Sequence, residues 1–184
     1  MTRTFTKSDA NKLTGSHIEI PYGYTAIGEK AFTGRWDINV VIIPDSVKSI
    51  EKEAFYDCVR LIKVDIPNSV TYIGEWAFAY CLCLLKIILP NSITCIESRA
   101  FTSCKCLDNV KIPSSVIAIG DCAFAKCEGL ERIAIPNSVK IFGEYVFAGC
   151  EELFVYCTKK SHARKYCRLN NKQVKLVSDN VKWG

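Results

Sequence analysis

Apolar and polar positions repeat along this chain with a constant period of 23 residues. In each unit an apolar residue follows the proline by three and by six positions, as at Val70 and Ile73, and an Ala-Phe pair comes next, as at Ala77 and Phe78. Such units cannot bury their apolar face alone, so they must stack on one another. The pattern therefore predicts a solenoid. The prolines that mark the units are Pro21, Pro44, Pro67, Pro90, Pro113 and Pro136.

Each unit ends with an alternation of apolar and polar residues, as in residues 61–66. A period of two indicates a half-buried strand, and stacking places these strands in one parallel sheet, which we expect to line a concave wall. A second, shorter strand is expected near residues 47–50, followed by a tight helical turn that carries Ala54 and Phe55. Serines such as Ser69 should bond a local backbone group after the proline. The residues expected to face inward from the sheet are Val64, Ile87, Val110 and Ile133.

A cysteine stands three residues after the phenylalanine in five units, and the first unit carries Arg35 there. Adjacent rungs lie about 4.7–4.9 Å apart, which is within reach of a disulfide. Five successive rungs cannot all pair, however, so we expect free thiols that pack as small apolar groups. With an odd total of 11 cysteines, this favours a reducing compartment. The column consists of Cys58, Cys81, Cys104, Cys127 and Cys150.

We expect a single domain over residues 1–184. Residues 1–17 are expected to form an N-terminal cap anchored by Phe5, residues 18–156 six repeats, and residues 157–184 a C-terminal cap. Both ends depart from the repeat because the outer faces of a solenoid meet water. The C-terminal cap should form a strand, a helix and a strand.

The chain has no apolar run of about 18 or more residues that would span a membrane. Its first residues also lack the apolar segment of a secretory signal. The location expected from this sequence is therefore the cytoplasm. A cell-surface or secreted location would require a leader or a larger parent chain.

The repeat reads Ile-Pro-x-Ser-Val-x-x-Ile-Gly-x-x-Ala-Phe-x-x-Cys-x-x-Leu-x-x-Val, and over residues 18–156 it resembles the BspA-type leucine-rich repeat. A period of about 20–29 residues lies in the leucine-rich-repeat range. The resemblance implies a curved, right-handed solenoid with a parallel sheet on the concave side and short strands and tight helical turns on the convex side. It also implies a scaffold of the kind found in surface proteins of bacteria and some protists, which bind host proteins or other cells, and it implies no catalytic residues.

Two cysteine pairs have a spacing that occurs among metal ligands, Cys81-x-Cys83 and Cys104-x-Cys106. A zinc site needs four side chains that converge, whereas the first cysteine of each pair should point inward and its companion elsewhere. The two histidines, His17 in the N-terminal cap and His162 in the C-terminal cap, lie near no acid or nucleophile in the predicted geometry. No phosphate-binding glycine loop and no recurring carboxylate pair appears, so we expect no metal, no cofactor and no enzyme activity.

The candidate binding site is the outward face of the predicted sheet, where a basic stripe alternates with exposed apolar side chains. Such a face suits a protein partner, in particular an acidic one, or an anionic glycan. The alternative is that these cations only keep a chain of net charge +5 soluble and prevent sheet pairing. Nucleic acid fits poorly, because the net charge is modest and no aromatic column faces outward. One outward column contains Val40, Lys63, Lys86, Asn109, Arg132 and Val155, and the next contains Ile42, Asp65, Ile88, Lys111 and Ala134.

These features favour a non-catalytic repeat scaffold that binds a protein through its concave sheet. The alternative is a bacterial or protist cell-surface adhesin, or a fragment of one, that binds a host matrix protein or an anionic glycan through the same face. Three tryptophans are expected to be exposed and could add contacts, Trp36, Trp76 and Trp183. The pattern sets neither the ligand nor the oligomeric state.

Overall fold

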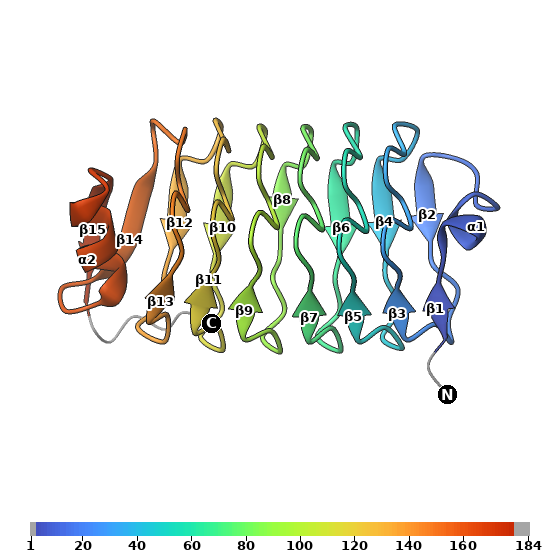
Figure 1. Ribbon diagram of the computed structural model, residues 1–184, viewed down its shortest axis with the longest axis horizontal. Helices are drawn as coiled ribbons and strands as arrows, with labels where there is room; N and C mark the ends of the chain where they lie inside the picture. The colour runs from blue at the N-terminus through green and yellow to red at the C-terminus, as the bar shows by residue number, and fades with distance from the viewer. Residues whose placement is uncertain (1–2, 179–184) are drawn as a thin grey trace.

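The protein forms a parallel β-solenoid in a computed structural model that describes residues 3–178. Its turns, here called rungs, are stacked in a row along the long axis, from β1 and α1 at one end to α2 and β15 at the other (Figure 1). The 23-residue period of the sequence is therefore the length of one rung, and the predicted solenoid of stacked repeats is confirmed.

The long sheet contains eight parallel strands and is the predicted sheet of the repeat. Val64, Ile87, Val110 and Ile133 are all buried, as the alternation predicted. The predicted C-terminal strand, helix and strand is also present, as β14, α2 (His162–Leu169) and β15. The strands are β2 (His17–Glu19), β4 (Val40–Ile42), β6 (Lys63–Asp65), β8 (Lys86–Ile87), β10 (Asn109–Lys111), β12 (Arg132–Ala134), β14 (Phe154–Thr158) and β15 (Gln173–Val177).

A second row of short strands runs along the molecule, as predicted, but in two separate sheets. The break lies between β7 and β9, which do not pair within the described residues. The first sheet contains β1 (Thr4–Phe5), β3 (Ala26–Ile27), β5 (Ser49–Ile50) and β7 (Tyr72–Ile73), and the second contains β9 (Cys95–Ile96), β11 (Ala118–Ile119) and β13 (Ile141–Phe142).

The Ala-Phe segments are not helical, which corrects the expectation of helical turns. Across residues 3–178 the only helices are α1 (Lys7–Ala10) and α2, both near the ends. Two residues of the second rung's turn, Glu53 and Asp57, have φ of 55° and 58°, in the left-handed region that ends an α-helix. Amides between them bond alternately within the rung and to the next rung, and the Phe55 amide donates to the Ala77 carbonyl at 2.8 Å. These turns thus form a third ladder between rungs.

Stacked phenylalanines form a continuous spine beside this third ladder. Neighbouring ring centroids lie 4.9 to 6.1 Å apart, and the interplanar angles are 22° or less. Phe5, expected as an anchor of the N-terminal cap, provides the first ring and stacks on Phe32. The spine also crosses the break between β7 and β9, where Phe78 and Phe101 stack at 5.5 Å. Its members are Phe5, Phe32, Phe55, Phe78, Phe101, Phe124 and Phe147.

Each cysteine of the inward column donates its thiol to the carbonyl of the spine phenylalanine one rung earlier. The Cys58 Sγ lies 3.0 Å from the Phe32 oxygen, and the other four distances are 3.1 or 3.2 Å. Burial raises the pKa of Cys58 from 9.0 to about 12, so the donor proton is retained. The column is therefore composed of free thiols, as predicted, and it adds bonds between rungs that a purely apolar residue could not form.

Arg35 occupies the thiol position in the first rung, where it forms hydrogen bonds to the N-terminal cap. Its guanidinium donates to the carbonyls of Ala10 and Leu13 and pairs with Asp37 at 2.6 Å.

The serines after the prolines also differ from expectation, because Ser69 Oγ donates to the Val47 carbonyl of the preceding rung and not to a local group.

Removing one ring from the middle of the spine should be severely destabilising. Phe78→Ala is expected to lower the free energy of unfolding by about 3–5 kcal/mol, because it leaves a cavity between two stacked rings. Chemical denaturation measures this, with Tyr145→Ala, at a side chain 65% exposed, as the control expected to change stability by less than about 0.5 kcal/mol. A loss for Phe78→Ala as small as that of the control would contradict the role of the spine.

Stability should fall at alkaline pH because the column thiols ionise only after unfolding. An unfolded thiol titrates near its ordinary value of 9.0, whereas the pKa of folded Cys58 is raised to about 12 by burial, so its contribution is complete below pH 9 and is lost as pH rises toward 12. Between these values the slope from this thiol approaches 1.4 kcal/mol per pH unit. Denaturation of Cys58→Ala over the same range should show a shallower decline than the wild type; parallel declines would contradict this assignment.

Candidate binding site on the long sheet

The first outward column lies in register across the sheet, as the period predicted. Val40 pairs with Lys63, Lys63 with Lys86, and Asn109 with both Lys86 and Arg132. At the next rung the register differs, because Arg132 pairs with Phe154. Val155 is consequently fully buried, and its predicted outward position is wrong. The cause is a final rung that is one residue shorter before its strand.

The second outward column also runs across neighbouring rungs, but its exposure varies. Ile42 pairs with Asp65, and Lys111 pairs with Ala134. Ile88 immediately follows β8 and is the most exposed apolar member, at 64%. Asp65 and Ala134 are half-buried.

The predicted basic stripe is partly neutralised by carboxylates on the same face. Lys63 pairs with Asp65 at 2.8 Å, and Arg132 pairs with Asp108 at 3.7 Å. Within residues 3–178, neither Lys86 nor Lys111 belongs to an ion pair, so these two cations are available to a partner.

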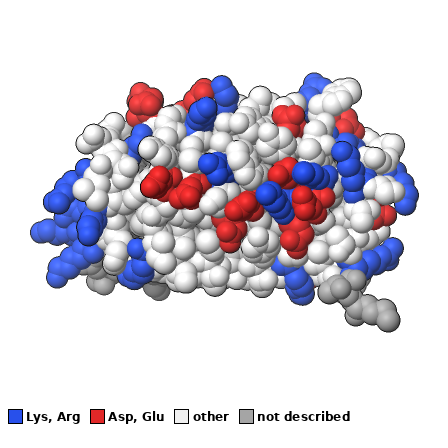
Figure 2. All heavy atoms as spheres, viewed as in Figure 1, with Lys and Arg blue, Asp and Glu red and all other residues white. Residues whose placement is uncertain are grey.

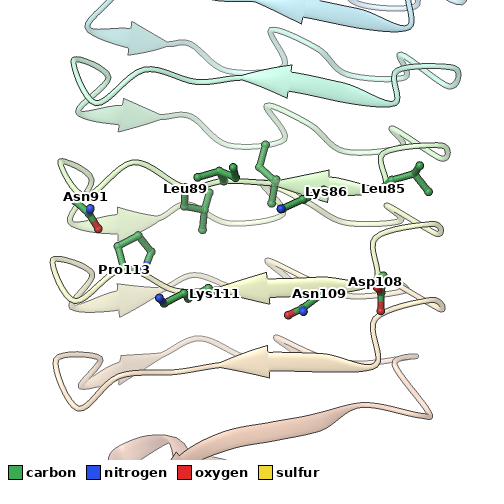
Figure 3. Close-up of a pocket in the computed structure, with 10 residues that line it drawn as sticks. Leu85, Lys86, Leu89, Asn91, Asp108, Asn109, Lys111 and Pro113 are labelled. Carbon is green, nitrogen blue, oxygen red and sulfur yellow. The ribbon is translucent and has the colours of Figure 1, made fainter. Parts of the chain in front are cut away.

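The outward face is hollowed between β8 and β10, and we call this depression the β8–β10 hollow. Its volume is about 530 Å³. Figure 3 shows residues of one rung on one side and residues of the next rung on the other. Two smaller hollows of about 200 and 180 Å³ adjoin it, and all three share Ile88. The residues that define the β8–β10 hollow here are Leu85, Lys86, Ile88, Asp108, Asn109 and Lys111.

The hollow coincides with the weakest pairing of the long sheet. β8 pairs with β10 only at Lys86 and Asn109, whereas β10 and β12 pair at three positions. In other rungs the amide just after the strand bonds the next rung, as from Ile43 to the Asp65 carbonyl at 3.2 Å and from Ile112 to the Ala134 carbonyl at 3.0 Å. Among the described residues the equivalent amides of Ile66 and Leu89, just after β6 and β8, make no backbone hydrogen bond of this kind. The rungs therefore separate where Ile88 is exposed.

The positive charge of the protein is concentrated at the C-terminal end and not on the long sheet. Seven Lys and Arg and no Asp or Glu lie between Lys159 and Lys175. The rest of the chain has 17 basic and 19 acidic residues, a net charge of −2. Figure 2 shows the cations gathered on the end that carries α2 and β15, at the left. We call this surface the basic cap; it consists of Lys159, Lys160, Arg164, Lys165, Arg168, Lys172 and Lys175.

The two cysteine pairs separate as the sequence predicted. Cys81 and Cys104 are buried in the thiol column, while Cys83 and Cys106 are exposed. Residues 3–178 contain no group of three or more side chains that could hold a metal ion. Both histidines are exposed.

The tryptophans differ from one another. Trp36 is 65% exposed, as predicted, but Trp76 is half-buried, stacks with Tyr80 and lies 5.1 Å beneath Arg99. Trp183 lies outside the described residues.

None of the helices in the described part of the chain has the length and apolar character needed to cross a bilayer.

The fold and its surfaces define a class of protein, a parallel β-solenoid repeat scaffold. The chain belongs to the BspA-type leucine-rich repeat family, because it matches that repeat region in six copies over residues 8–105 and 76–167. A comparison with curated proteins gives no match.

Solved structures support the same fold. A leucine-rich cell surface protein from Faecalibacterium prausnitzii is 28% identical, with a TM-score of 0.66, over 91% of this chain and 52% of that one. A leucine-rich repeat protein from Bacteroides ovatus is 27% identical, with a TM-score of 0.59, over 77% of this chain and 47% of that one. The chain thus spans about half the length of these two relatives. The leucine-rich repeat protein of T. pallidum, 23% identical over 89% of this chain and 87% of that one with a TM-score of 0.64, shares the fold.

Proposed function

We propose that this protein is a non-catalytic scaffold that holds a protein partner on the outward face of the long sheet, with the β8–β10 hollow at the centre. The observation that carries the proposal is the exposed apolar side chains that meet there. Ile88 is 64% exposed and Leu85 55%, and Ile62 and Ile42 lie on the two preceding rungs. An exposed apolar patch of this kind is typical of an interaction site.

The charges around the hollow favour an acidic partner. Lys86 and Lys111 line it and have no ion-pair partner within the described residues, whereas Asp65 and Asp108 are already paired with cations. Carboxylates of a partner would relieve the repulsion between Lys86 and its neighbour Lys63. An apolar centre with a charged rim is the usual anatomy of a protein interface.

Binding of this kind requires no cofactor and no metal. The family and fold are typically non-catalytic, and we propose that this chain is not an enzyme and acts as a single domain over residues 1–184. The F. prausnitzii relative is a cell surface protein, which supports the surface alternative over the cytoplasm. The cysteines do not oppose that location, because buried thiols with raised pKa values, such as Cys58, resist oxidation in either compartment.

The basic cap supports a second candidate function, adhesion to an anionic polymer such as an acidic glycan. Seven cations without an intervening acid attract polyanions strongly at low salt. The long sheet, the other candidate surface for this role, carries its cations beside carboxylates. The cap is therefore the better site for an anionic glycan, and the hollow the better site for a protein.

The hollow is tested by placing a charge at its centre. Ile88→Glu should weaken partner binding at least about tenfold, because it puts a carboxylate into an apolar contact. The measurement is capture from producer lysate and from an extracellular-matrix preparation, followed by titration of the captured protein. Ile141→Glu is the matched control, since Ile141 is 63% exposed on the other row of strands. Equal binding by the two variants would contradict the proposed site.

The basic cap is tested by comparing two triple variants of equal charge. Replacing Lys160, Lys165 and Arg168 by Gln should lower the salt concentration that elutes the protein from an immobilised sulfated glycan. Replacing Lys63, Lys86 and Lys111 by Gln removes the same charge from the long sheet and should have a smaller effect. The reverse order would assign the glycan to the sheet, and no retention of the wild type would exclude this second function.

A further inference from the structure

Two exposed cysteines lie side by side on adjacent rungs near the edge of the hollow. The Cys106 amide donates to the Leu82 carbonyl at 3.0 Å, which places Cys106 directly beside Cys83 in a parallel arrangement. Paired residues on neighbouring parallel strands lie about 4.7–4.9 Å apart. A disulfide spans Cα atoms about 4.4–6.8 Å apart, so the paired positions of Cys83 and Cys106 suit one.

The surroundings distinguish these two thiols from the inward column. Cys81 and Cys104 are fully buried and donate to phenylalanine carbonyls, whereas Cys83 and Cys106 are exposed and make no side-chain hydrogen bond within the described residues. On the next rung the residue beside Cys106 is Gly129, which has no side chain. A Cβ added there would lie 2.6 Å from the Lys105 carbonyl oxygen. No side chain therefore competes with Cys106 on that side.

The neighbouring charges favour an anionic reagent. The Cys83 amide donates to the Val59 carbonyl, which places Arg60 beside Cys83 in the same column. Lys105 directly precedes Cys106, and it pairs at the surface with Glu128. An anionic small-molecule disulfide would thus approach two accessible thiols beside Arg60, which belongs to no ion pair within residues 3–178.

We propose that Cys83 and Cys106 are a modification site, a dithiol that forms a cross-rung disulfide by exchange with an anionic small-molecule disulfide such as oxidised glutathione. The thiolate of one cysteine attacks a sulfur of the reagent, forms a mixed disulfide and releases one small thiol. The second thiolate attacks the protein sulfur of that mixed disulfide and releases the other small thiol. The protein loses two electrons and two protons, and the reagent gains them.

The disulfide would join the two rungs that pair least within the long sheet. β8 and β10 share one paired position, Lys86 with Asn109, and the β8–β10 hollow begins directly after the two cysteines. The cross-link would fix the spacing of the rungs at this edge of the hollow. The inference stands on the geometry of the cysteines and does not depend on a partner binding there.

The test exposes the folded, reduced protein to oxidised glutathione and maps the cysteines by mass spectrometry. We expect a species lacking two hydrogens, with Cys83 joined to Cys106 and with Cys81 and Cys104 unmodified, which a dithiol reductant reverses. Cys83→Ser should stop at a mixed disulfide on Cys106, and Cys106→Ser at one on Cys83. Since both side chains are exposed, circular dichroism should show that these variants fold.

Three results would overturn the proposal. They are stable glutathione adducts on both cysteines of the wild type, cross-links only between separate molecules, or a cross-link that forms equally fast at the buried pair. The first two results would mean that the outer thiols do not meet in the folded chain, and the third that exposure does not distinguish them from the inward column.

Discussion

The structure depends on the contact between one rung and the next through the phenylalanine spine and the turn ladder beside it. Both sheets weaken near the middle of the molecule, the long sheet at β8 and the second row between β7 and β9. The spine continues across that point, with Phe78 stacked on Phe101 and with the Phe78 amide bonded to the Ala100 carbonyl at 2.9 Å. A rung contacts only its neighbours, so the solenoid stays one stack only if at least one row of contacts joins every pair of neighbouring rungs.

Because contacts inside the solenoid hold the rungs together, a hollow can form on the outward face without loss of the fold. The spine and the thiols hold the rungs from inside, so the outward edge at β8 can open and expose Ile88. The opening provides an apolar depression on the outward face of the long sheet, and the flanking lysines give it a charged border. The positive charge at the C-terminal end is a separate feature, which allows one scaffold to offer two chemically different surfaces.

The sequence predicted the features that repeat with the 23-residue period. The inward columns, the stacked phenylalanines and the alignment of Lys63 with Lys86 follow from the spacing alone. The prediction from the sequence failed where one rung departs from the others. Val155 is buried because its rung is one residue shorter. The hollow arises because β8 pairs with β10 at fewer positions than β10 pairs with β12. The turns were expected to be helical because left-handed residues spaced four apart, such as Glu53 and Asp57, leave no apolar signature. The basic cap could have been found, since its run without acids is visible in the sequence.

Hydrogen exchange of individual backbone amides tests the central claim most directly. The account predicts that the amides of Ile66 and Leu89 exchange quickly, whereas those of Phe78 and Phe101 in the third ladder and of Ile112 and Ile135 in other rungs are strongly protected. Rapid exchange confined to the amides of Ile66 and Leu89, on the two sides of the β8 rung, would show that the spine holds the rungs while the sheet opens over the hollow. Equal protection of Leu89 and Ile112 would contradict the account, because the long sheet would then be continuous through β8.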